Sequence, residues 1–549
     1  MHRYYWAFAF LFIIYLIGFA IDVMDVDAAQ YASMSREMLQ TGSYLQLYDV
    51  GKEYLDKPPF LMWISAASMK IFGINNFAYR LPSFLFSLLA ILSTYKLARQ
   101  FYSDKISFFS ALVLASSQGF ILMNHDVRTD TILMSWVVFT LWQLAVFYQT
   151  NSFLHFFAAC VGIAGGLMTK GPIALIVPVF AFGSHFLLQR NFRAFFKWQY
   201  LVGIIIIGIL ILPMCIGLYQ QFDLQPNKVV NGKTGVSGLR FFFWTQSFGR
   251  ITGESDWNNH SNIFFLLQNM LWSFLPWIFL FLIAFFIQVK FIVRQGFIIS
   301  RQQEAVTTGG FVLTYLSLGL SNYQLPHYIF VVFPLASIIT ARFLYGLTVE
   351  NKYRKMYPSL LYGHLILFTL MWIALCALLY FPFKNIPGFA AVIAVILLIV
   401  FVYLFITHKN RRSILITLCL FTTIGINFFL NSSFYPSLLQ YQMGNTAGRW
   451  IAKQKIPTET IKVYKIDAWR SLHFYAKGNI YRQDSVENIK PGDWIITGNE
   501  NLAELTEHGV KYDMFYMGKS FHVSRLSMKF INRARREREL TPYTIIKVK

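Results

Sequence analysis

The feature that most constrains this chain is a series of apolar blocks of about 20 residues, the length an α-helix needs to cross about 30 Å of hydrocarbon. Such blocks recur up to about residue 430 and predict about 13 membrane-spanning helices. Of all residues 56% are hydrophobic and only 13% are charged, which excludes a disordered chain, a fibrous repeat and a single soluble core. The sequence therefore predicts an α-helical polytopic membrane protein.

The expected spans have boundaries defined to within about 2–4 residues. The first block is long and aromatic and lacks a small-residue cleavage site, so we expect a retained helix rather than a removed signal peptide. The blocks lie near residues 4–21, 81–98, 106–124, 131–148, 153–168, 172–188, 200–219, 263–289, 306–320, 328–347, 359–382, 388–407 and 413–430.

The distribution of basic residues predicts which side of the membrane each connection faces. The formal net charge is +22, which in a soluble protein would suggest binding to nucleic acid. In a membrane protein the excess of basic residues has another explanation, because they collect in cytoplasmic loops. Clusters such as Arg190, Arg193 and Lys197 follow the even-numbered blocks. We therefore expect a cytoplasmic N-terminus, an outer C-terminus, contact with membrane lipids and no nucleic-acid partner.

The composition changes after about residue 431, which predicts a transmembrane domain over 1–431 and a second domain over 432–549. The second part carries many charges, β-like runs at 461–466, 494–497 and 544–548, and a helical stretch at 501–508. We expect a small α/β domain outside the cytoplasm. Its basic run from Arg525 to Arg538 is interpreted as a solvated helix face, or alternatively as a contact with anionic headgroups or lipopolysaccharide.

The first outer loop, residues 22–80, is rich in carboxylates. Asp27 and Tyr31 have helical spacing, which predicts a helix on the membrane surface with Asp27 near its N-terminus, where a carboxylate favours the helix dipole. Asp27 is therefore either a helix-terminal residue or a functional acid. Further on, Pro58 and Pro59 predict a helix start with Asp56 and Lys57 just outside it. Lys57 could bind a lipid phosphate, or the motif could serve only to start the helix.

Two short outer connections also contain charged residues, although placing a charge in or near the membrane costs desolvation free energy. The turn His125-Asp-Val-Arg-Thr-Asp130 should face a polar cavity, and its plain interpretation is an ion pair of Arg128 with Asp126 or Asp130. Lys170 lies in the very short connection between the fifth and sixth blocks, so its side chain could extend to the membrane interface or bind a phosphate.

Two later outer segments add further candidates. The 219–262 loop contains Arg250 and His260, and the tenth block opens with Ser321-Asn-Tyr-Gln-Leu-Pro-His-Tyr328. His260 is either an interfacial side chain or, together with Asp56, a ligand of a divalent metal ion that the chemistry does not require. The chain has no P-loop, nucleophile-elbow serine, His-Glu-x-x-His or dinucleotide fingerprint.

These motifs, in their order, resemble those of membrane glycosyltransferases that use polyprenyl-phosphate-linked sugars, a family that includes aminoarabinose transferases and protein O-mannosyltransferases. The resemblance extends to about residue 345 and is weak beyond it. It rests on Asp27-Ala-Ala-Gln-Tyr-Ala32, Ser35-Arg-Glu-Met-Leu39, Tyr54 to Phe60, Arg80, Arg128, Asp130, Thr169-Lys-Gly-Pro172, Phe248-Gly-Arg250, His260, Leu275-Pro-Trp277 and Leu325-Pro-His-Tyr328.

The resemblance implies two surface helices in the first outer loop and an active site at the periplasmic face of a bacterial inner membrane. Asp27 matches the expected catalytic aspartate, with Asp130 beside it. Lys57, Arg250 and Lys170 would hold the carrier phosphate, with Arg80 as a further candidate, and Tyr31, Arg128, His327 and Tyr328 would line the substrate cavity. The chain departs from its relatives at Gln30, where they often carry arginine, and this leaves one phosphate contact open.

The residues themselves fit such a reaction, because departure of a lipid phosphate needs cations and an acceptor needs a carboxylate to orient or deprotonate it. The predicted donor is a polyprenyl (undecaprenyl) phosphate sugar, and the predicted acceptor is lipid A or another glycolipid. Two alternatives stay open: transfer to a protein hydroxyl, as in protein O-mannosyltransferases, and a lipid-linked-sugar flippase or transporter. A transporter usually shows inverted repeats and broken helices near the midplane, whereas here the charge lies in outer loops.

Overall fold

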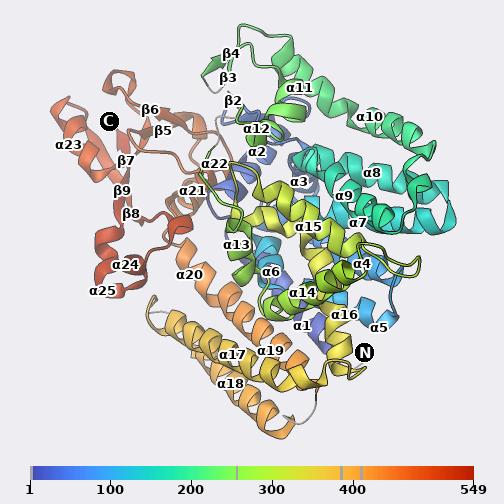
Figure 1. Ribbon diagram of the computed structural model, residues 1–549. Coiled ribbons are helices and arrows are strands. Elements are labelled where there is room, and N and C mark those ends of the chain that lie inside the picture. The colour runs from blue at the N-terminus through green and yellow to red at the C-terminus, as the bar shows by residue number, and fades with distance from the viewer. Residues whose placement is uncertain (1–3, 231, 255–257, 384–387, 409–411) are drawn as a thin grey trace.

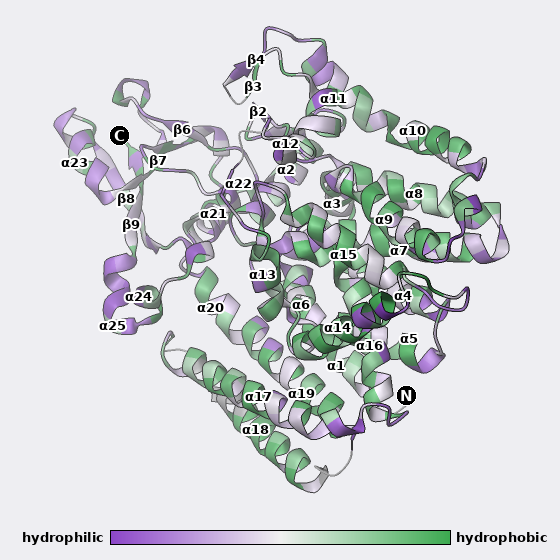
Figure 2. Cartoon of the chain, viewed as in Figure 1, coloured by the Kyte–Doolittle hydropathy of each residue, from purple (hydrophilic) through white to green (hydrophobic). Residues whose placement is uncertain are grey.

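The computed structural model describes residues 4–549 apart from 231, 255–257, 384–387 and 409–411. Its larger part is a bundle of helices, from which a smaller unit containing a β-sheet projects at one side (Figure 1). Colouring by hydropathy shows the same division, because apolar residues dominate the bundle helices and hydrophilic residues gather in the smaller unit (Figure 2). The predicted combination of an apolar helical part and a small C-terminal α/β part is confirmed.

Every predicted apolar block contains helical structure. The helices of these blocks are α1 (Tyr5–Ile17), α4 (Asn76–Arg99), α5 (Asp104–Ala115), α6 (Gln118–His125), α7 (Thr129–Thr150), α8 (Phe153–Lys170), α9 (Ile173–Leu188), α10 (Gln199–Leu218), α13 (Phe265–Ser273), α14 (Ile278–Arg294), α15 (Val306–Gly319), η6 (Pro326–Val332), α16 (Phe333–Thr348), α17 (Tyr357–Tyr380), α18 (Gly388–His408) and α19 (Ile414–Phe429).

The chain is a multi-span membrane protein, although fewer helices than predicted meet a strict length criterion. Within the described residues, seven helical segments are long and apolar enough to cross a membrane, or eight if the bent pair α5–α6 is one span. The third block divides where α5 and α6 meet at 56°. The eighth divides between α13 and α14 at Pro276, which has no N–H to donate within a helix.

Close helix packing in the bundle depends on small residues. On α8, Gly162 and Gly165 face Thr140 and Trp136 of α7, and a Cβ atom at either glycine would collide with those side chains. Small residues at such contacts allow membrane helices to approach closely. This packing holds α7 and α8 side by side, with Asp130 at the start of one helix and Lys170 at the end of the other.

The first outer loop contains the two predicted helices, α2 (Asp27–Thr41) and α3 (Phe60–Phe72), with a short hairpin of β1 (Tyr48–Asp49) and β2 (Lys52–Glu53) between them. Helix α2 ends at Gly42, whose φ of 73° is the left-handed conformation that glycine adopts at helix ends. Helix α3 begins directly after Pro59, as the double proline predicts. The later outer loop contains β3 (Val229–Val230), β4 (Lys233–Thr234), α11 (Gly238–Arg240) and α12 (Gly249–Thr252).

The C-terminal unit is built on a five-stranded mixed sheet with the order β6-β5-β7-β9-β8. The predicted strands are β5, β7 and β9, while β6 and β8 were missed. Val463 pairs with Ile496, and Ile496 pairs with Ile545, so that a buried apolar row crosses the sheet. The elements are α20 (Tyr435–Leu439), α21 (Met443–Gln454), β5 (Ile461–Tyr464), α22 (Arg470–Tyr475), β6 (Tyr481–Gln483), β7 (Trp494–Gly498), α23 (Asn499–Glu507), β8 (Tyr512–Ser520), α24 (Met528–Ile531), α25 (Arg533–Arg536) and β9 (Thr541–Val548).

The basic run at 525–538 departs from the expectation of one solvated helix face. It contains two short helices, α24 and α25, and Arg536 is buried against the rings of Phe383, Tyr441 and Phe530. The spacing of basic residues along a sequence does not show which of them will meet an aromatic cluster, and the interpretation is wrong for Arg536.

Candidate active site

A large cavity, about 910 Å³, lies between the first outer loop, the start of α7, η6 and the C-terminal unit. Most of the predicted site residues line it, although they come from segments far apart in the sequence. These residues are Asp27, Tyr31, Asp56, Lys57, Arg128, Asp130, Arg250, His327 and Tyr328.

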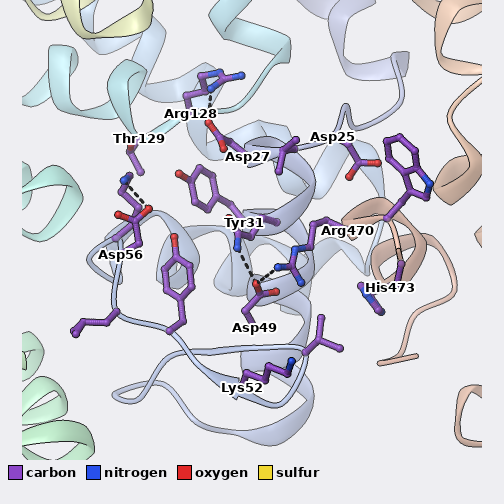
Figure 3. Close-up of a pocket in the computed structure, with 18 of the residues that line it drawn as sticks. Asp25, Asp27, Tyr31, Asp49, Lys52, Asp56, Arg128, Thr129, Arg470 and His473 are labelled. Carbon is purple, nitrogen blue, oxygen red and sulfur yellow. Dashed lines mark hydrogen bonds and ion pairs between the residues drawn. The ribbon is translucent and has the colours of Figure 1, made fainter. Parts of the chain in front are cut away.

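Asp27 is the first residue of α2, and its carboxylate forms an ion pair with Arg128 (Figure 3). Arg128 Nε also donates to Asp126 Oδ2 at 2.8 Å. Burial lowers the pKa of Arg128, but Asp126 and Asp27 together raise it above its ordinary value. The Asp27 side chain keeps 36% of its surface exposed, so the ion pair orients the carboxylate while leaving it open to the cavity.

Asp130 has different partners from those the turn alone suggests. Its carboxylate pairs with Lys170, and His327 Nε2 lies 3.6 Å from Asp130 Oδ2. The Asp130 side chain is only 4% exposed. Of the two alternatives for Arg128, the pair with Asp126 is present, whereas Asp130 is taken by a lysine from the neighbouring helix.

Lys57 and Asp56 face the cavity just before α3. Their side chains form an ion pair at 2.8 Å, and Gln246 Nε2 donates to Asp56 Oδ1 at 2.8 Å. Burial acts to raise the pKa of Asp56, but Lys57, Arg250 and Gln246 outweigh it and hold the pKa below its usual value. Asp56 therefore stays ionised and fixes the Lys57 ammonium at the cavity wall.

Arg250 joins the main cavity to a second, smaller one. It is 9% exposed, its Nη1 donates to the Tyr328 hydroxyl at 2.7 Å, and its guanidinium lies 5.1 Å from the centre of the Tyr323 ring. The second cavity, about 120 Å³, has mostly apolar walls from α9 and α15. Four residues line both cavities: Lys57, Asp130, Arg250 and Tyr328. Lys170 lines only the second, with its Nζ 4.1 Å from the centre of the Tyr328 ring.

Arg80 and His260 do not line either cavity. Arg80 is 1% exposed, and it donates from Nε to His125 O and from Nη2 to Asp22 O, each at 2.9 Å. These bonds tie α4 to the end of α6 and to the segment after α1. His260 is exposed in the loop before α13.

The side chains proposed as metal ligands do not form a metal site in the part of the chain that the structure describes. There, no three His, Cys, Asp or Glu side chains are grouped so that they could hold an ion. Asp56 is engaged by Lys57 and Gln246 instead.

The C-terminal unit supplies one wall of the cavity, which the sequence reasoning missed. Trp469, Arg470 and His473 line it from the segment at the start of α22. Arg470 pairs with Asp49 at 3.0 Å, and Gln30 donates to the same carboxylate at 2.7 Å (Figure 3). Burial raises the pKa of Asp49, with Arg470 opposing the shift. The sequence pattern that could have identified this wall is the run Asp467-Ala-Trp-Arg470, which follows an apolar strand.

This wall is held against the first outer loop by buried polar contacts. Ser471 donates from its backbone N and its hydroxyl to the two oxygens of Asp25, at 3.0 and 2.7 Å. Asn479 Nδ2 donates to Glu37 Oε1 at 3.0 Å. Phe474 packs into the apolar cluster formed by α2, α3 and the start of α4. The cavity therefore has two walls that belong to distant parts of the chain but pack as one unit.

Comparisons with known proteins agree with this architecture. Residues 56–216 match a family model described as dolichyl-phosphate-mannose-protein mannosyltransferase. An undecaprenyl phosphate-alpha-4-amino-4-deoxy-L-arabinose arabinosyl transferase of Pseudomonas fluorescens is 25% identical over 391 residues, which cover 69% of this chain and 66% of that protein. Crystal structures of ArnT from Cupriavidus metallidurans, in the apo state and bound to undecaprenyl phosphate, superpose with TM-scores of 0.72 and 0.71.

The resemblance to polyprenyl-phosphate-sugar-dependent membrane glycosyltransferases is confirmed. The two ArnT structures are 15% and 17% identical to this chain. Each alignment covers 99% of it and 98% of ArnT, so the shared fold includes the C-terminal unit. The sequence match reaches just under two thirds of the length of the Pseudomonas relative. The fold is therefore established.

Proposed function

We propose that this protein is a glycosyltransferase that moves a sugar from a polyprenyl phosphate donor, such as undecaprenyl phosphate, to lipid A or another glycolipid at the outer face of the inner membrane. One observation carries the proposal: a polar cavity lined by carboxylates meets a small apolar cavity at a pair of cations, Lys57 and Arg250. A polyprenyl phosphate sugar matches this order, because it has a polar sugar, then a charged phosphate, then an apolar chain.

The donor would lie across the junction of the two cavities. The isoprenoid chain would contact the apolar walls at α9 and α15, and the phosphate would lie near Lys57 and Arg250. The Lys57 side chain is 13% exposed, and desolvated cations attract a phosphate more strongly than cations in water do. Arg250 supplies a planar fork and Lys57 a point charge, while Lys170 adds positive charge on the apolar side.

In the proposed reaction the bond between the anomeric carbon and the phosphate oxygen breaks, and a bond from that carbon to an acceptor oxygen forms. The leaving group is the polyprenyl phosphate, whose developing negative charge is stabilised by Lys57 and Arg250. Asp27 would accept the proton of a hydroxyl acceptor; a phosphate acceptor is already nucleophilic, and Asp27 would then only position it.

The two acids have different proposed roles because their exposure differs. Asp27 keeps 36% of its side-chain surface exposed, whereas Asp130 keeps 4%. We assign the contact with the acceptor to Asp27. Asp130, held between Lys170 and His327, would position the lysine that faces the donor. Tyr31, Arg128, His327 and Tyr328 would shape the sugar-binding part of the cavity.

The acceptor is proposed to be a lipid, because the cavity lies where the bundle meets the C-terminal unit, at the ends of apolar helices. The Pseudomonas relative carries a name that specifies an undecaprenyl-phosphate-linked aminoarabinose donor. The family model describes a protein mannosyltransferase, so transfer to protein is the second candidate. A flippase without transfer is the third.

We further propose thirteen spans, a division into domains at 1–431 and 432–549, a cytoplasmic N-terminus and a periplasmic C-terminal domain. The basic clusters after even-numbered blocks support this orientation. A reporter fused after Lys549 should be active only outside the cytoplasm, and a cysteine at Asn191 should react only with a reagent supplied from inside. A cytoplasmic C-terminus would invert every proposed site.

The deciding experiment supplies the purified chain in proteoliposomes with polyprenyl phosphate carrying a radiolabelled sugar, and with lipid A and an unfolded protein as competing acceptors. Label in lipid A, separated from the labelled donor by chromatography, supports the proposal, and label in protein replaces it with the second candidate. Label that crosses the bilayer while still attached to its carrier supports the flippase. The Asp27→Asn variant, tested in parallel, separates enzymatic transfer from a contaminating activity.

A further inference from the structure

The basic segment, residues 523–539, lies outside the cavity and takes no part in the proposed reaction. It comprises η11 (Val523–Arg525), α24, α25 and η12 (Glu537–Glu539). The segment connects β8 to β9, and His522 immediately before it lines the cavity. A second role for this segment is indicated by its contacts.

One side of the basic segment is fixed to the end of a spanning helix. Arg533 donates from Nη2 to Tyr380 O at 2.6 Å and also to Phe383 O, while the buried Arg536 donates to Pro382 O. Tyr380 and Phe381, at the end of α17, are 74% and 60% exposed. Because α17 belongs to a segment long and apolar enough to cross a membrane, the basic segment lies at the depth where that helix leaves the hydrocarbon.

The other side of the segment combines exposed apolar and exposed basic side chains. Leu526 is 41% exposed and Met528 is 80% exposed. Among the described residues, no ion-pair partner is found for the exposed basic side chains Arg525, Lys529, Arg535 and Arg538. The nearby Glu537 is paired with Lys519. Apolar residues flanked by unpaired cations at a membrane surface are the pattern of an interfacial segment that contacts anionic headgroups.

We propose that the basic segment lies in the headgroup layer of the bilayer and binds the phosphates of anionic phospholipids. Leu526 and Met528 enter the boundary between headgroups and acyl chains, and the four exposed basic side chains of the same segment contact the phosphates. The segment thereby anchors the C-terminal unit to the membrane at a second place, away from the contact between α2 and α22. This binding does not depend on the proposed glycosyl transfer.

The test places a fluorescent bimane label at Met528→Cys in the full chain, reconstituted in nanodiscs of phosphatidylcholine and phosphatidylglycerol. Cys376 and Cys215, the free cysteines that are not fully buried, are first changed to serine. Bromine on the acyl chains of one lipid or of the other then reports which lipid lies beside the label. The matched control is Met514→Cys, which is 55% exposed and lies near the start of β8, outside the basic segment.

We expect brominated phosphatidylglycerol to quench the label at 528 about twofold more than brominated phosphatidylcholine at equal mole fraction. The label at 514 should be quenched by neither. Absence of quenching at 528 by both lipids would show that the segment does not contact the membrane. Equal quenching by both lipids would show apolar contact without selection of anionic headgroups, and would overturn the proposed phosphate binding.

A charge-reduced variant separates the basic side chains from the general charge of the protein. Changing Arg525, Lys529, Arg535 and Arg538 to glutamine should bring the quenching ratio at 528 to about one. The matched control changes four exposed lysines on other parts of the C-terminal unit to glutamine, namely Lys453, Lys455, Lys490 and Lys511, and should leave the ratio unchanged. Equal loss in both variants would mean that net charge, and not this segment, attracts the lipid.

Discussion

The two walls of the main cavity differ in how their cations are held. On the bundle side, the Lys57 and Arg128 side chains are 13% and 21% exposed and pair with acids beside them. On the C-terminal side, the Arg470 and Arg482 side chains are 37% and 48% exposed. Because charges act more strongly when water is excluded, the first wall suits stabilisation of a leaving phosphate. The second wall suits recognition of an incoming acceptor.

The largest expected effect comes from the bundle wall, at Asp27. Asp27→Asn keeps the shape of the side chain but removes the charge, and transfer should fall by roughly 100-fold or more because general-base and electrostatic contributions are of that size. Initial rates in proteoliposomes measure it. Asp104→Asn, at an exposed pair with Arg99, is the control and should keep normal activity. Near-normal turnover in Asp27→Asn would leave this residue only a role at the start of α2.

The next effect is on donor binding at the junction of the two cavities. Lys57→Ala or Arg250→Ala should weaken binding of a short-chain polyprenyl phosphate by about 1.5–3 kcal/mol, the contribution of a hydrogen bond to a charged group. Arg250→Lys should recover only part of this, since lysine lacks the bidentate fork.

Titration calorimetry in detergent measures this binding, and Lys52→Ala provides the comparison. Lys52 lines the main cavity but not the smaller one, so its loss should change the affinity little. Unchanged affinity in both junction variants would mean that Lys57 and Arg250 serve folding, and the phosphate site would then be sought at Lys170.

A smaller effect is expected on the C-terminal wall. Arg470→Gln removes the ion pair with Asp49, although Gln30 still donates to that carboxylate. The value of kcat/KM for the acceptor should fall about three- to tenfold, the equivalent of one hydrogen bond, while donor affinity stays constant. A fall in donor affinity instead would show that the C-terminal wall also contributes to donor binding. Arg482→Gln, at a more exposed pair, should have the weaker effect.

The smallest expected effect concerns the contact between the two walls, at Asp25. Burial raises the pKa of Asp25 to about 6, although the hydrogen bonds from Ser471 oppose the shift. The docked state therefore holds a proton more tightly than the unfolded state, whose pKa is about 3.9. The resulting contribution to the free energy of unfolding is fully present below about pH 4 and is lost as the pH rises through about 6.

Thermal unfolding of the purified protein between pH 4 and 7 tests this dependence. The difference in Tm between wild type and Asp25→Asn should change by a few degrees across this window, with wild type losing stability relative to the variant as the pH rises. A constant difference would show that Asp25 does not titrate in this range. Asp493→Asn, at a pair with Lys462 within the C-terminal unit, controls for changes that are not at the contact.

Much of the bundle was predictable because its signals are local. An apolar block must form its backbone hydrogen bonds within itself in a membrane, so all predicted blocks contain helices. The double proline at 58 and 59 predicted the start of α3, and the spacing from Asp27 predicted α2. Two blocks divided. The break between α13 and α14 lies at Pro276, a local signal, whereas the bend between α5 and α6 depends on the packing around it.

The sequence by itself determined which residues carry charge at the ends of apolar helices, since keeping a charge there is costly and each one stands out. Only the tertiary structure decided how they pair: Arg128 with Asp27, and Asp130 with Lys170 across 40 positions of chain. It also brought Arg470 to Asp49. Pairing requires side chains to meet in space, and helix packing, not sequence distance, sets which of them do.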